Sequence, residues 1–236
     1  MRGRRSVPGI LCVVAVVGGC SSRGRSVPPP PAAEAEPPPG LSVSGFWSTW
    51  GEPLADILEG HRDRLGGRCR GDLAVIIRKS ERRLVVACDG DPVKGYFIAL
   101  GRTPEGGKER RGDGRTPEGE FYLWGKNPYS RFHLGLGVSY PDAEAADRGL
   151  ASGLIDAATH RRILKALAAR AEPPQDTPLG GSIFIHGGGI GEVLCRSDGK
   201  YARIRDWTEG CVALRNQDVE ELFALLPAGT PIRIQP

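Results

Sequence analysis

A cysteine at the entrance to an apolar run is the residue whose setting best suits it to chemistry. Cys211 follows Thr208-Glu209-Gly210 and precedes Val212-Ala213-Leu214, so it stands where a loop enters a buried segment. Gly210 lets the backbone bend sharply and can present amide N–H groups to an oxyanion. A thiol is mostly protonated at neutral pH, so Cys211 needs a base or a positive neighbour to become a reactive thiolate.

The matching base is a histidine at the end of a predicted strand. His186 follows Ser182-Ile183-Phe184-Ile185 and precedes three glycines that leave access to its ring. Loops at strand ends commonly carry catalytic groups. Each residue also has a structural interpretation: Cys211 as a small buried hydrophobe, and His186 as a hydrogen-bonded structural ring. The residues alone leave both interpretations open.

The other cysteines do not form a metal site by spacing. The chain has six cysteines and four histidines, with no close pair such as Cys-x₂-Cys or His-x₃-His, so we expect no metal and no organic cofactor. Cys69 and Cys88 flank a predicted hairpin, and a disulfide between them is an open alternative. His61 and His160 lie on predicted helices, where structural or solvated roles are expected.

The elements that must position Cys211 and His186 follow from hydrophobic periodicity. Strands are predicted over 73–78, 83–88, 95–100, 120–124, 182–185 and 231–234, and helices over 52–65, 142–149, 153–171 and from Asn216, a good N-cap, to Pro227. This balance predicts a mainly β domain with a few helices, an α+β fold, over residues 45–236.

The N-terminus reads as an export signal. Residues 1–19 combine three arginines with an apolar run shorter than the roughly 20 residues that span a bilayer. The run ends in Val17-Gly18-Gly19-Cys20, which resembles a bacterial lipobox and predicts lipidation of Cys20; a soluble secreted protein is the alternative. Residues 20–44 are Pro-rich and predict an extended linker. The whole predicts a domain held off a membrane surface by a lipid anchor.

The charge balance argues against a nucleic-acid partner. The formal net charge of +4 falls to +1 without the three arginines of the predicted signal. A nucleic-acid-binding domain is expected to carry a strong positive field, which is absent here.

The motifs around both candidate residues resemble a known family. Ile185-His186-Gly187, followed by Trp207-Thr208-Glu209-Gly210-Cys211-Val212-Ala213-Leu214, is similar to the signature of the L,D-transpeptidase (YkuD-type) catalytic domain. Further segments resemble one branch of the family, which remodels murein: 99–104, 112–122, 130–134, 139–142 and 179–181. The resemblance covers about residues 70–236.

This resemblance implies a β-sandwich-like catalytic fold and covalent chemistry on peptidoglycan. Cys211 would attack a stem-peptide amide after a meso-diaminopimelate residue and form a thioester, with His186 as acid and base. Gly210 and Gly187 would supply backbone support to the oxyanion. The setting implied is the periplasmic face of a bacterial cell envelope, with peptidoglycan stem peptides and envelope proteins as partners and cell shape as the process served.

Two residues depart from the commonest family pattern. Glu209 stands where a second histidine is usual, which leaves His186 as the sole histidine base. Ala213 stands where an arginine is frequent, which removes a charge that could bind a carboxylate. The candidates to compensate are Arg215, or Arg131 together with His133 and Tyr140, and Thr208 is a further candidate for substrate binding. Residues 192–205 look inserted and predict a lid that contains Cys195.

Three functions fit the sequence. An amine acceptor would make the protein a transpeptidase that forms cross-links or attaches envelope proteins. Water as the acceptor would make it a hydrolase or amidase at the same site. The third function, a non-catalytic peptidoglycan-binding lipoprotein, is disfavoured because both Cys211 and His186 are retained.

Overall fold

A large mixed β-sheet dominates the structure, which is a computed structural model describing residues 53–64, 72–191, 193–195 and 201–236. The strands are β1 (Leu73–Arg78), β2 (Arg83–Cys88), β3 (Asp91–Phe97), β4 (Gly119–Ser130), β5 (His133–Val138), β6 (Phe184–His186), β9 (Val212–Ala213) and β10 (Pro231–Gln235). They lie in the order β3-β2-β1-β10-β4-β5-β6-β9. With four helices beside the sheet, the predicted α+β class is confirmed.

The last strand of the chain lies near the centre of this sheet. β10 pairs in parallel with β1 and antiparallel with β4, through registers that include Ile232 opposite Val75 and Phe121. Burial alternates along β10, with Ile232 and Ile234 inside and Arg233 exposed. This alternation is the pattern of a strand with one face on the core.

The two ends of the sheet are tied together where the chain leaves β3. Ala99, two residues beyond β3, pairs with Ala213 of β9 through N–H···O bonds of 2.9 and 2.8 Å in the two directions. Thr208 then pairs with Gly101. The segment 99–102 therefore runs beside the segment that leads into Cys211, so the candidate nucleophile lies where the sheet edges meet.

Two helices cover the main core. α1 (Leu54–Arg64) contributes three buried aliphatic side chains and α4 (Asn216–Leu225) contributes Val219 and Leu222, which pack with the aliphatic residues of the strands. The predicted inward face of α4 is confirmed, with Leu222 and Leu226 fully buried and Phe223 and Leu225 partly buried against the core. Burial of each large aliphatic side chain stabilises the fold by roughly 1.5–3 kcal/mol.

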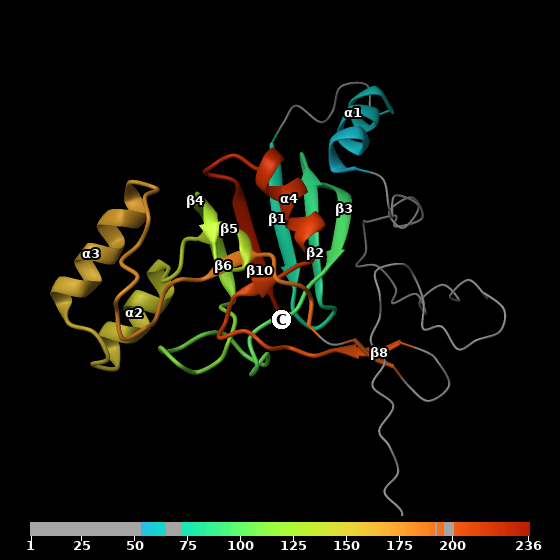
Figure 1. Cartoon of the computed structure of the whole chain (residues 1–236). Helices are drawn as coiled ribbons and strands as arrows, with labels where there is room; N and C mark the ends of the chain where they lie inside the picture. The colour runs from blue at the N-terminus through green and yellow to red at the C-terminus, as the bar shows by residue number, and fades with distance from the viewer. Residues whose placement is uncertain (1–52, 65–71, 192, 196–200) are drawn as a thin grey trace, which may run out of the picture.

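A second, smaller cluster stands to one side of the sheet. α2 (Ala143–Ala151) and α3 (Ala157–Ala168) pack on each other around Ala146, Ile155 and Ile163 (Figure 1). Both begin at aspartate N-caps: Asp142 accepts from Ala145 N at 2.9 Å and Asp156 from Thr159 N at 2.7 Å. Such caps satisfy amide donors that a helix leaves unpaired at its start.

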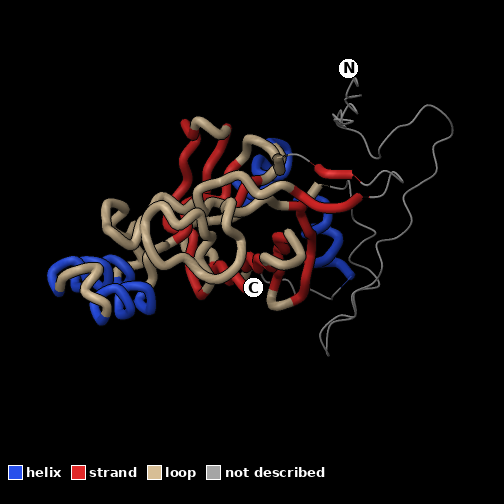
Figure 2. The backbone as a smooth tube through the Cα atoms, turned by 90° about the horizontal axis from the view of Figure 1, so that it is seen from below, coloured by secondary structure: helices blue, strands red, loops and turns tan. Residues whose placement is uncertain are grey.

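Loops gather at one end of the sheet, as Figure 2 shows from below. The longest of them, residues 98–118, joins β3 to β4. A separate two-stranded sheet pairs β7 (Val193–Cys195) with β8 (Tyr201–Ile204). The predicted lid over 192–205 stays a prediction, because residues 192 and 196–200 lie outside the described residues.

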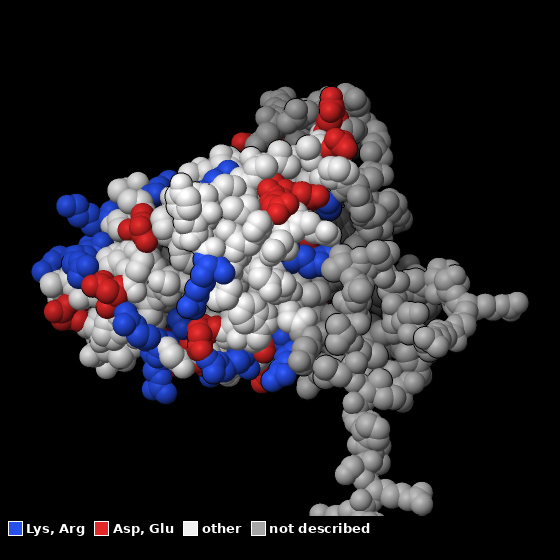
Figure 3. Space-filling model, in the orientation of Figure 1, with Lys and Arg blue, Asp and Glu red and all other residues white. Residues whose placement is uncertain are grey.

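Several sequence predictions fall on parts of the chain that are not described. The export signal, Cys20, the Pro-rich linker and Cys69 lie outside the described residues. Cys88 is disulfide-bonded, and its predicted partner Cys69 is one of those undescribed residues. No helix in the described ranges is long and apolar enough to cross a membrane. Basic and acidic side chains are interspersed on the face shown in Figure 3.

Candidate active site

Cys211 sits beside β6 in a sharp turn that only glycine can precede. Gly210 has φ +133°, and a Cβ there would lie 2.5 Å from the carbonyl oxygen of Arg115. The Thr208 hydroxyl braces the same turn, since Thr208 Oγ1 accepts from Gly210 N at 3.1 Å and donates to Cys211 O at 2.7 Å. The turn thus presents the Cys211 side chain from a fixed backbone.

The thiol of Cys211 contacts the strand that carries His186. Its Sγ donates to Ser182 O at 3.3 Å and accepts from Phe184 N at 3.4 Å. Cys211 is a free cysteine, and it is half-buried. Burial raises the pKa of the Cys211 thiol, while the Phe184 N–H and the charges of Lys108 and Arg131 lower it, and the net change is upward. A protonated thiol therefore needs a neighbouring base.

The register of β6 and β9 brings Cys211 next to the strand that ends in His186. Ile185 pairs with Val212 and His186 with Ala213, in parallel. Cys211, which directly precedes β9, therefore lies beside Phe184, two residues before His186, and its Sγ contacts the Phe184 N–H. Cys211 and His186 form no hydrogen bond with each other among the described residues; hydrogen bonds between catalytic groups are often long before substrate binds.

The imidazole of His186 is held in one tautomer. His186 Nδ1 lies 2.6 Å from Gly187 O, which can only accept, so Nδ1 carries the proton. Within the described residues Nε2 makes no hydrogen bond, which leaves its lone pair available to take a proton. Burial lowers the pKa of His186, the Gly187 bond partly raises it, and the charge of Arg131 lowers it further.

Two aromatic rings enclose the imidazole. The Phe132 ring stacks on His186 with centroids 4.6 Å apart, and the Trp207 ring meets it edge-on at 5.9 Å. Trp207 also meets Phe132 edge-on at 5.5 Å, and its Nε1 donates to Gly189 O at 3.3 Å. These rings bury His186, which is 2% exposed, and are the physical source of its lowered pKa.

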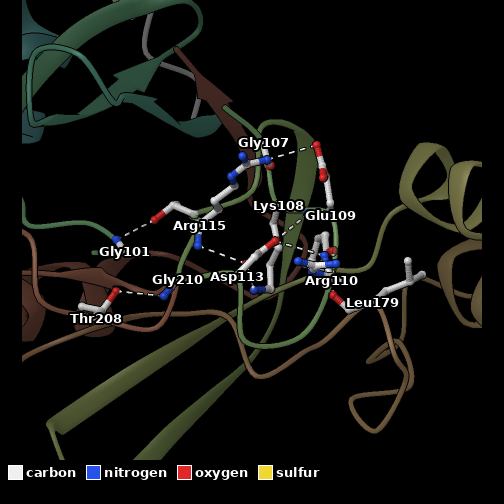
Figure 4. A network of polar contacts seen from close by, with 12 residues as sticks. Gly101, Gly107, Lys108, Glu109, Arg110, Asp113, Arg115, Leu179, Thr208 and Gly210 are labelled. Carbon is white, nitrogen blue, oxygen red and sulfur yellow. Dashed lines mark hydrogen bonds and ion pairs between the residues drawn. The ribbon is translucent and has the colours of Figure 1, made fainter. Parts of the chain in front are cut away.

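A buried polar network supports the floor of the site (Figure 4). Asp113 accepts from Lys108 Nζ at 2.7 Å and from the backbone N–H groups of Glu109, Arg110 and Arg115 at 2.8 to 3.1 Å. Burial alone would raise the pKa of Asp113, but these bonds outweigh it and lower the pKa. The network shapes the 98–118 loop, whose Arg115 carbonyl lies against Gly210.

A cavity of about 540 Å³ lies near Cys211, the candidate nucleophile. Its polar lining includes Lys108, Arg111, Gln175, Asp176, Ser182 and Glu209. Ser182 is the residue whose carbonyl accepts from the Cys211 thiol, so the cavity opens beside the sulfur. A second cavity, of about 520 Å³, lies between Lys108 and Arg233; neither Cys211 nor His186 lines either cavity.

The predicted substrate-binding residues are not all available. Arg215 is locked to Asp218 by hydrogen bonds of 2.8 and 3.1 Å. Tyr140, a predicted substrate-binding candidate, is 1% exposed and donates to Leu179 O at 3.0 Å, so its hydroxyl is buried and already has a partner. Thr208 is buried in the nucleophile turn. His133 is exposed but paired with Glu220 at 2.6 Å.

Arg131 is the remaining candidate cation. It is exposed, packs over the Phe132 ring at 4.7 Å, and has no carboxylate partner in the part of the chain that the structure describes. Its charge acts on both Cys211 and His186. Glu209, in the place of the second family histidine, forms an exposed ion pair with Arg102 at the cavity.

The backbone N–H groups of the two glycines predicted to bind the oxyanion already have hydrogen-bond acceptors. Gly210 N donates to Thr208 Oγ1, and Gly187 N donates to Leu134 O at 3.2 Å. The backbone N–H of Cys211 has no acceptor among the described residues, so it is the amide still free to meet an oxyanion. The described residues contain no group of three or more His, Cys, Asp or Glu side chains that could hold a metal ion.

Sequence reasoning missed the roles of four residues near the site. Phe132 and Trp207 lie within the quoted motifs but carried no assignment, and only the stacking geometry reveals their part. Lys108 carried no assignment either, although its buried partner, Asp113, stands five residues later. Asn216 was predicted as the N-cap of α4, but the N-cap is Arg215, without a side-chain bond.

Comparison with known proteins assigns the fold to a family. The family model for the L,D-transpeptidase catalytic domain (YkuD) matches residues 72–234. A comparison with curated proteins found no match.

Solved structures give remote matches. Bd1075 of Bdellovibrio bacteriovorus is 19% identical, with a TM-score of 0.42 over 70% of this chain and 48% of that one. The helical cell shape determining protein Pgp2 of Campylobacter jejuni is 19% identical (TM-score 0.41; 75% and 55%). An L,D-transpeptidase from Mycobacterium smegmatis is 12% identical (0.38; 70% and 59%). This chain spans about half the length of these proteins. On the strength of the family model, the chain belongs to the L,D-transpeptidase (YkuD) catalytic-domain family.

Proposed function

We propose that this protein is a cysteine acyltransferase that remodels peptidoglycan through a thioester on Cys211. The observation that carries the proposal is the pairing of β6 with β9, which brings Cys211, the residue before β9, within two residues of His186 in the register of the neighbouring strand. The hydrogen bond from Nδ1 to Gly187 O keeps the proton on Nδ1, so Nε2 of His186 has a lone pair that can accept the thiol proton. Membership of the family supports a stem peptide that contains meso-diaminopimelate as the acyl donor.

The first half-reaction forms the thioester. His186 Nε2 takes the thiol proton as Cys211 Sγ bonds to the donor amide carbon. The backbone N–H of Cys211 stabilises the oxyanion that develops on the carbonyl oxygen. When the C–N bond breaks, His186 returns its proton to the leaving amine, and the terminal D-amino acid departs.

The second half-reaction releases the acyl group. An acceptor amine gives a proton to His186 and attacks the thioester carbon, so a new amide forms. The C–S bond then breaks, and the sulfur regains the proton from His186. The 540 Å³ cavity beside Ser182 and Glu209 is the space in which a peptide branch would lie. Arg131 would meet a substrate carboxylate, because it faces the site without a carboxylate partner among the described residues.

The proposed setting is the periplasmic face of a bacterial cell envelope, with the domain held by lipid on Cys20. The support is the lipobox-like Val17-Gly18-Gly19-Cys20 and the Pro-rich segment that follows it. Stem peptides of peptidoglycan are the proposed substrates, and envelope proteins are proposed acceptors.

Defined muropeptides test the reaction. The purified protein is incubated with labelled tetrapeptide and tripeptide muropeptides, and the products are identified by mass spectrometry. Transfer predicts cross-linked dimers and release of the terminal D-amino acid. Free stem peptides without dimers would show that water is the acceptor and that the protein is a hydrolase of the same site.

The covalent step has its own readout. Intact-mass spectrometry should detect a Cys211 adduct with a carbapenem or a thiol-reactive probe under reducing conditions. Cys211→Ser is expected to lose the adduct, whereas Arg215→Ala, which changes a residue bound to Asp218, should keep it. The absence of an adduct on the wild-type protein, together with no muropeptide product, rejects the catalytic proposal.

A further inference from the structure

We propose that Asn216 is a positioning residue for the histidine base and acts on it through a single peptide group. Asn216 opens α4, yet it does not cap that helix: the N-cap is Arg215, which makes no side-chain cap bond. Instead, Asn216 Oδ1 accepts from the backbone N–H of Gly188 at 2.8 Å. Asparagine commonly caps helices, but here its side chain binds the loop that follows His186.

The contact matters because of which peptide group it holds. The N–H of Gly188 and the C=O of Gly187 belong to the same planar unit. One end of that unit donates to Asn216 Oδ1, and the other accepts from His186 Nδ1 at 2.6 Å. Because the unit is rigid, fixing its N–H also fixes the direction of the carbonyl that selects the tautomer of His186.

The relay also acts electrostatically. Accepting a hydrogen bond from an N–H polarises the peptide, so its carbonyl becomes a better acceptor for the next donor. Asn216 therefore favours the Nδ1–H tautomer, in which Nε2 holds the lone pair that the chemistry needs. In other enzymes a carboxylate orients a histidine in this way.

Gly187 is closely packed against Asn216 and Phe132. A Cβ at Gly187 would lie 2.7 Å from Asn216 Oδ1 and 2.8 Å from Phe132 O, so this position has no room for a side chain. Two backbone bonds hold the flanks of the loop, Leu214 N to His186 O and Gly189 N to Leu214 O, both at 2.8 Å. Between them, the 187–188 peptide depends on Asn216 for its N–H bond.

The identity of the accepting atom follows from chemistry. The partner of Asn216 is a backbone N–H, which only donates, so the amide must turn its oxygen and not its nitrogen toward Gly188. Aspartate has an oxygen at the same position and should preserve the contact, whereas alanine removes it. Asn216 is exposed, so neither change opens a cavity in the core.

The tautomer of His186 tests the proposal directly. Full-length protein labelled with ¹⁵N-histidine is observed by NMR at a pH above the imidazole pKa, and His186 is assigned by the loss of its signals in His186→Gln. We expect wild type and Asn216→Asp to show the Nδ1–H form and Asn216→Ala to show a mixture. Gln217→Ala, an exposed neighbour on the same helical turn, is the matched control and should match wild type.

Enzyme kinetics supply the second readout, and this part of the test rests on the proposed function. Asn216→Ala should lower kcat about tenfold, the loss expected for one hydrogen bond, with little change in KM. An Nδ1–H tautomer in Asn216→Ala as pure as in wild type overturns the proposal. Should the alanine variant fail to fold, loss of the Nδ1–H form in folded Asn216→Asp overturns it equally. Inactivity of the wild type on muropeptides would instead count against the proposed function, since the tautomer measurement does not depend on it.

Discussion

Burial acts on Cys211 and His186 in directions that keep both side chains uncharged at rest. It raises the pKa of the thiol and lowers the pKa of the imidazole. A resting thiolate–imidazolium pair is therefore disfavoured, and proton transfer must accompany attack on the substrate. The enclosing rings of Phe132 and Trp207 contribute to the lowered pKa of His186, because they exclude water from the imidazole.

The pH dependence of thiol reactivity follows from these shifts. The rate of Cys211 alkylation by iodoacetamide should be low at about pH 6 and rise with pH through a pKa above the ~8.5 of an ordinary thiol. Intact-mass spectrometry over a pH series measures the rate, with Cys211→Ser as the background. A rate already maximal at about pH 6 would reveal a resting ion pair and contradict this account.

Arg131 and Arg215 make a matched pair of arginines, because Arg131 has no carboxylate partner among the described residues whereas Arg215 binds Asp218. Arg131→Ala should raise KM for a muropeptide roughly tenfold, the loss expected for a charge-assisted hydrogen bond, with a smaller change in kcat. Arg215→Ala should leave KM near its wild-type value, because the guanidinium already binds Asp218. Steady-state kinetics of the two variants compares them, and equal effects on KM would refute the assignment.

Residue types in the sequence suggest Cys211 as a nucleophile and His186 as its base, but they do not say which arginine has a carboxylate partner. Asp218, three residues after Arg215, was the visible sign that this arginine has a partner one helical turn away. Nothing local marks Tyr140 as buried, because its burial depends on Leu179 and Phe121, which are distant in the chain. The sequence shows the type of a side chain, but its tertiary neighbours decide whether that side chain is exposed and free to bind substrate.

At the scale of elements, the 98–118 loop depends on Asp113. The pKa of this carboxyl is lower in the folded state than in the unfolded chain, so the charged form favours folding. Its contribution is complete above the unfolded pKa of about 3.9 and is lost as pH falls through the lower folded value. Lys108, whose side chain is 3% exposed, is its buried partner.

Removing the Asp113 charge should therefore destabilise the fold at neutral pH. Asp113→Asn is expected to lower the free energy of unfolding by about 2 kcal/mol at pH 7, because Lys108 keeps a buried charge without its counterion. Urea denaturation measures the change. Asp176→Asn, an exposed residue 3.7 Å from Arg162, should change it by less than about 0.5 kcal/mol. Equal losses in both variants would show that the network does not stabilise the loop.

Strand prediction succeeded for the strands richest in β-branched residues and missed several others, among them the glycine-rich β5. β1, β2 and β10 carry valine and isoleucine and were predicted within a residue or two. β5 was missed, since His-Leu-Gly-Leu-Gly-Val has low strand propensity. Its glycines leave room for aromatic rings instead: a Cβ at Gly137 would lie 2.2 Å from the Trp124 ring and one at Gly135 3.3 Å from Phe184. Neighbouring strands, and not its own residues, make β5 a strand.

At the scale of the whole molecule, the lipid anchor remains a prediction from Cys20. In cells, Cys20→Ser should move the protein from the membrane fraction to the soluble fraction and abolish incorporation of an alkyne-labelled fatty acid. The reason is that lipidation of this type requires the thiol at that position. Cys195→Ser is a matched control and should keep the label. A wild-type protein that carries no label would favour the soluble secreted alternative.

The central position of β10 in the sheet affects the order in which the site can assemble. Residues 231–235 join the half-sheet of β1 to β3 with the half-sheet that contains β4, β5, β6 and β9. Because the chain is made from its N-terminus, every other strand is already synthesised before the piece that joins the halves exists. A nascent chain without β10 thus holds its thiol and imidazole before the two half-sheets are joined. Synthesis of β10 therefore precedes assembly of the site.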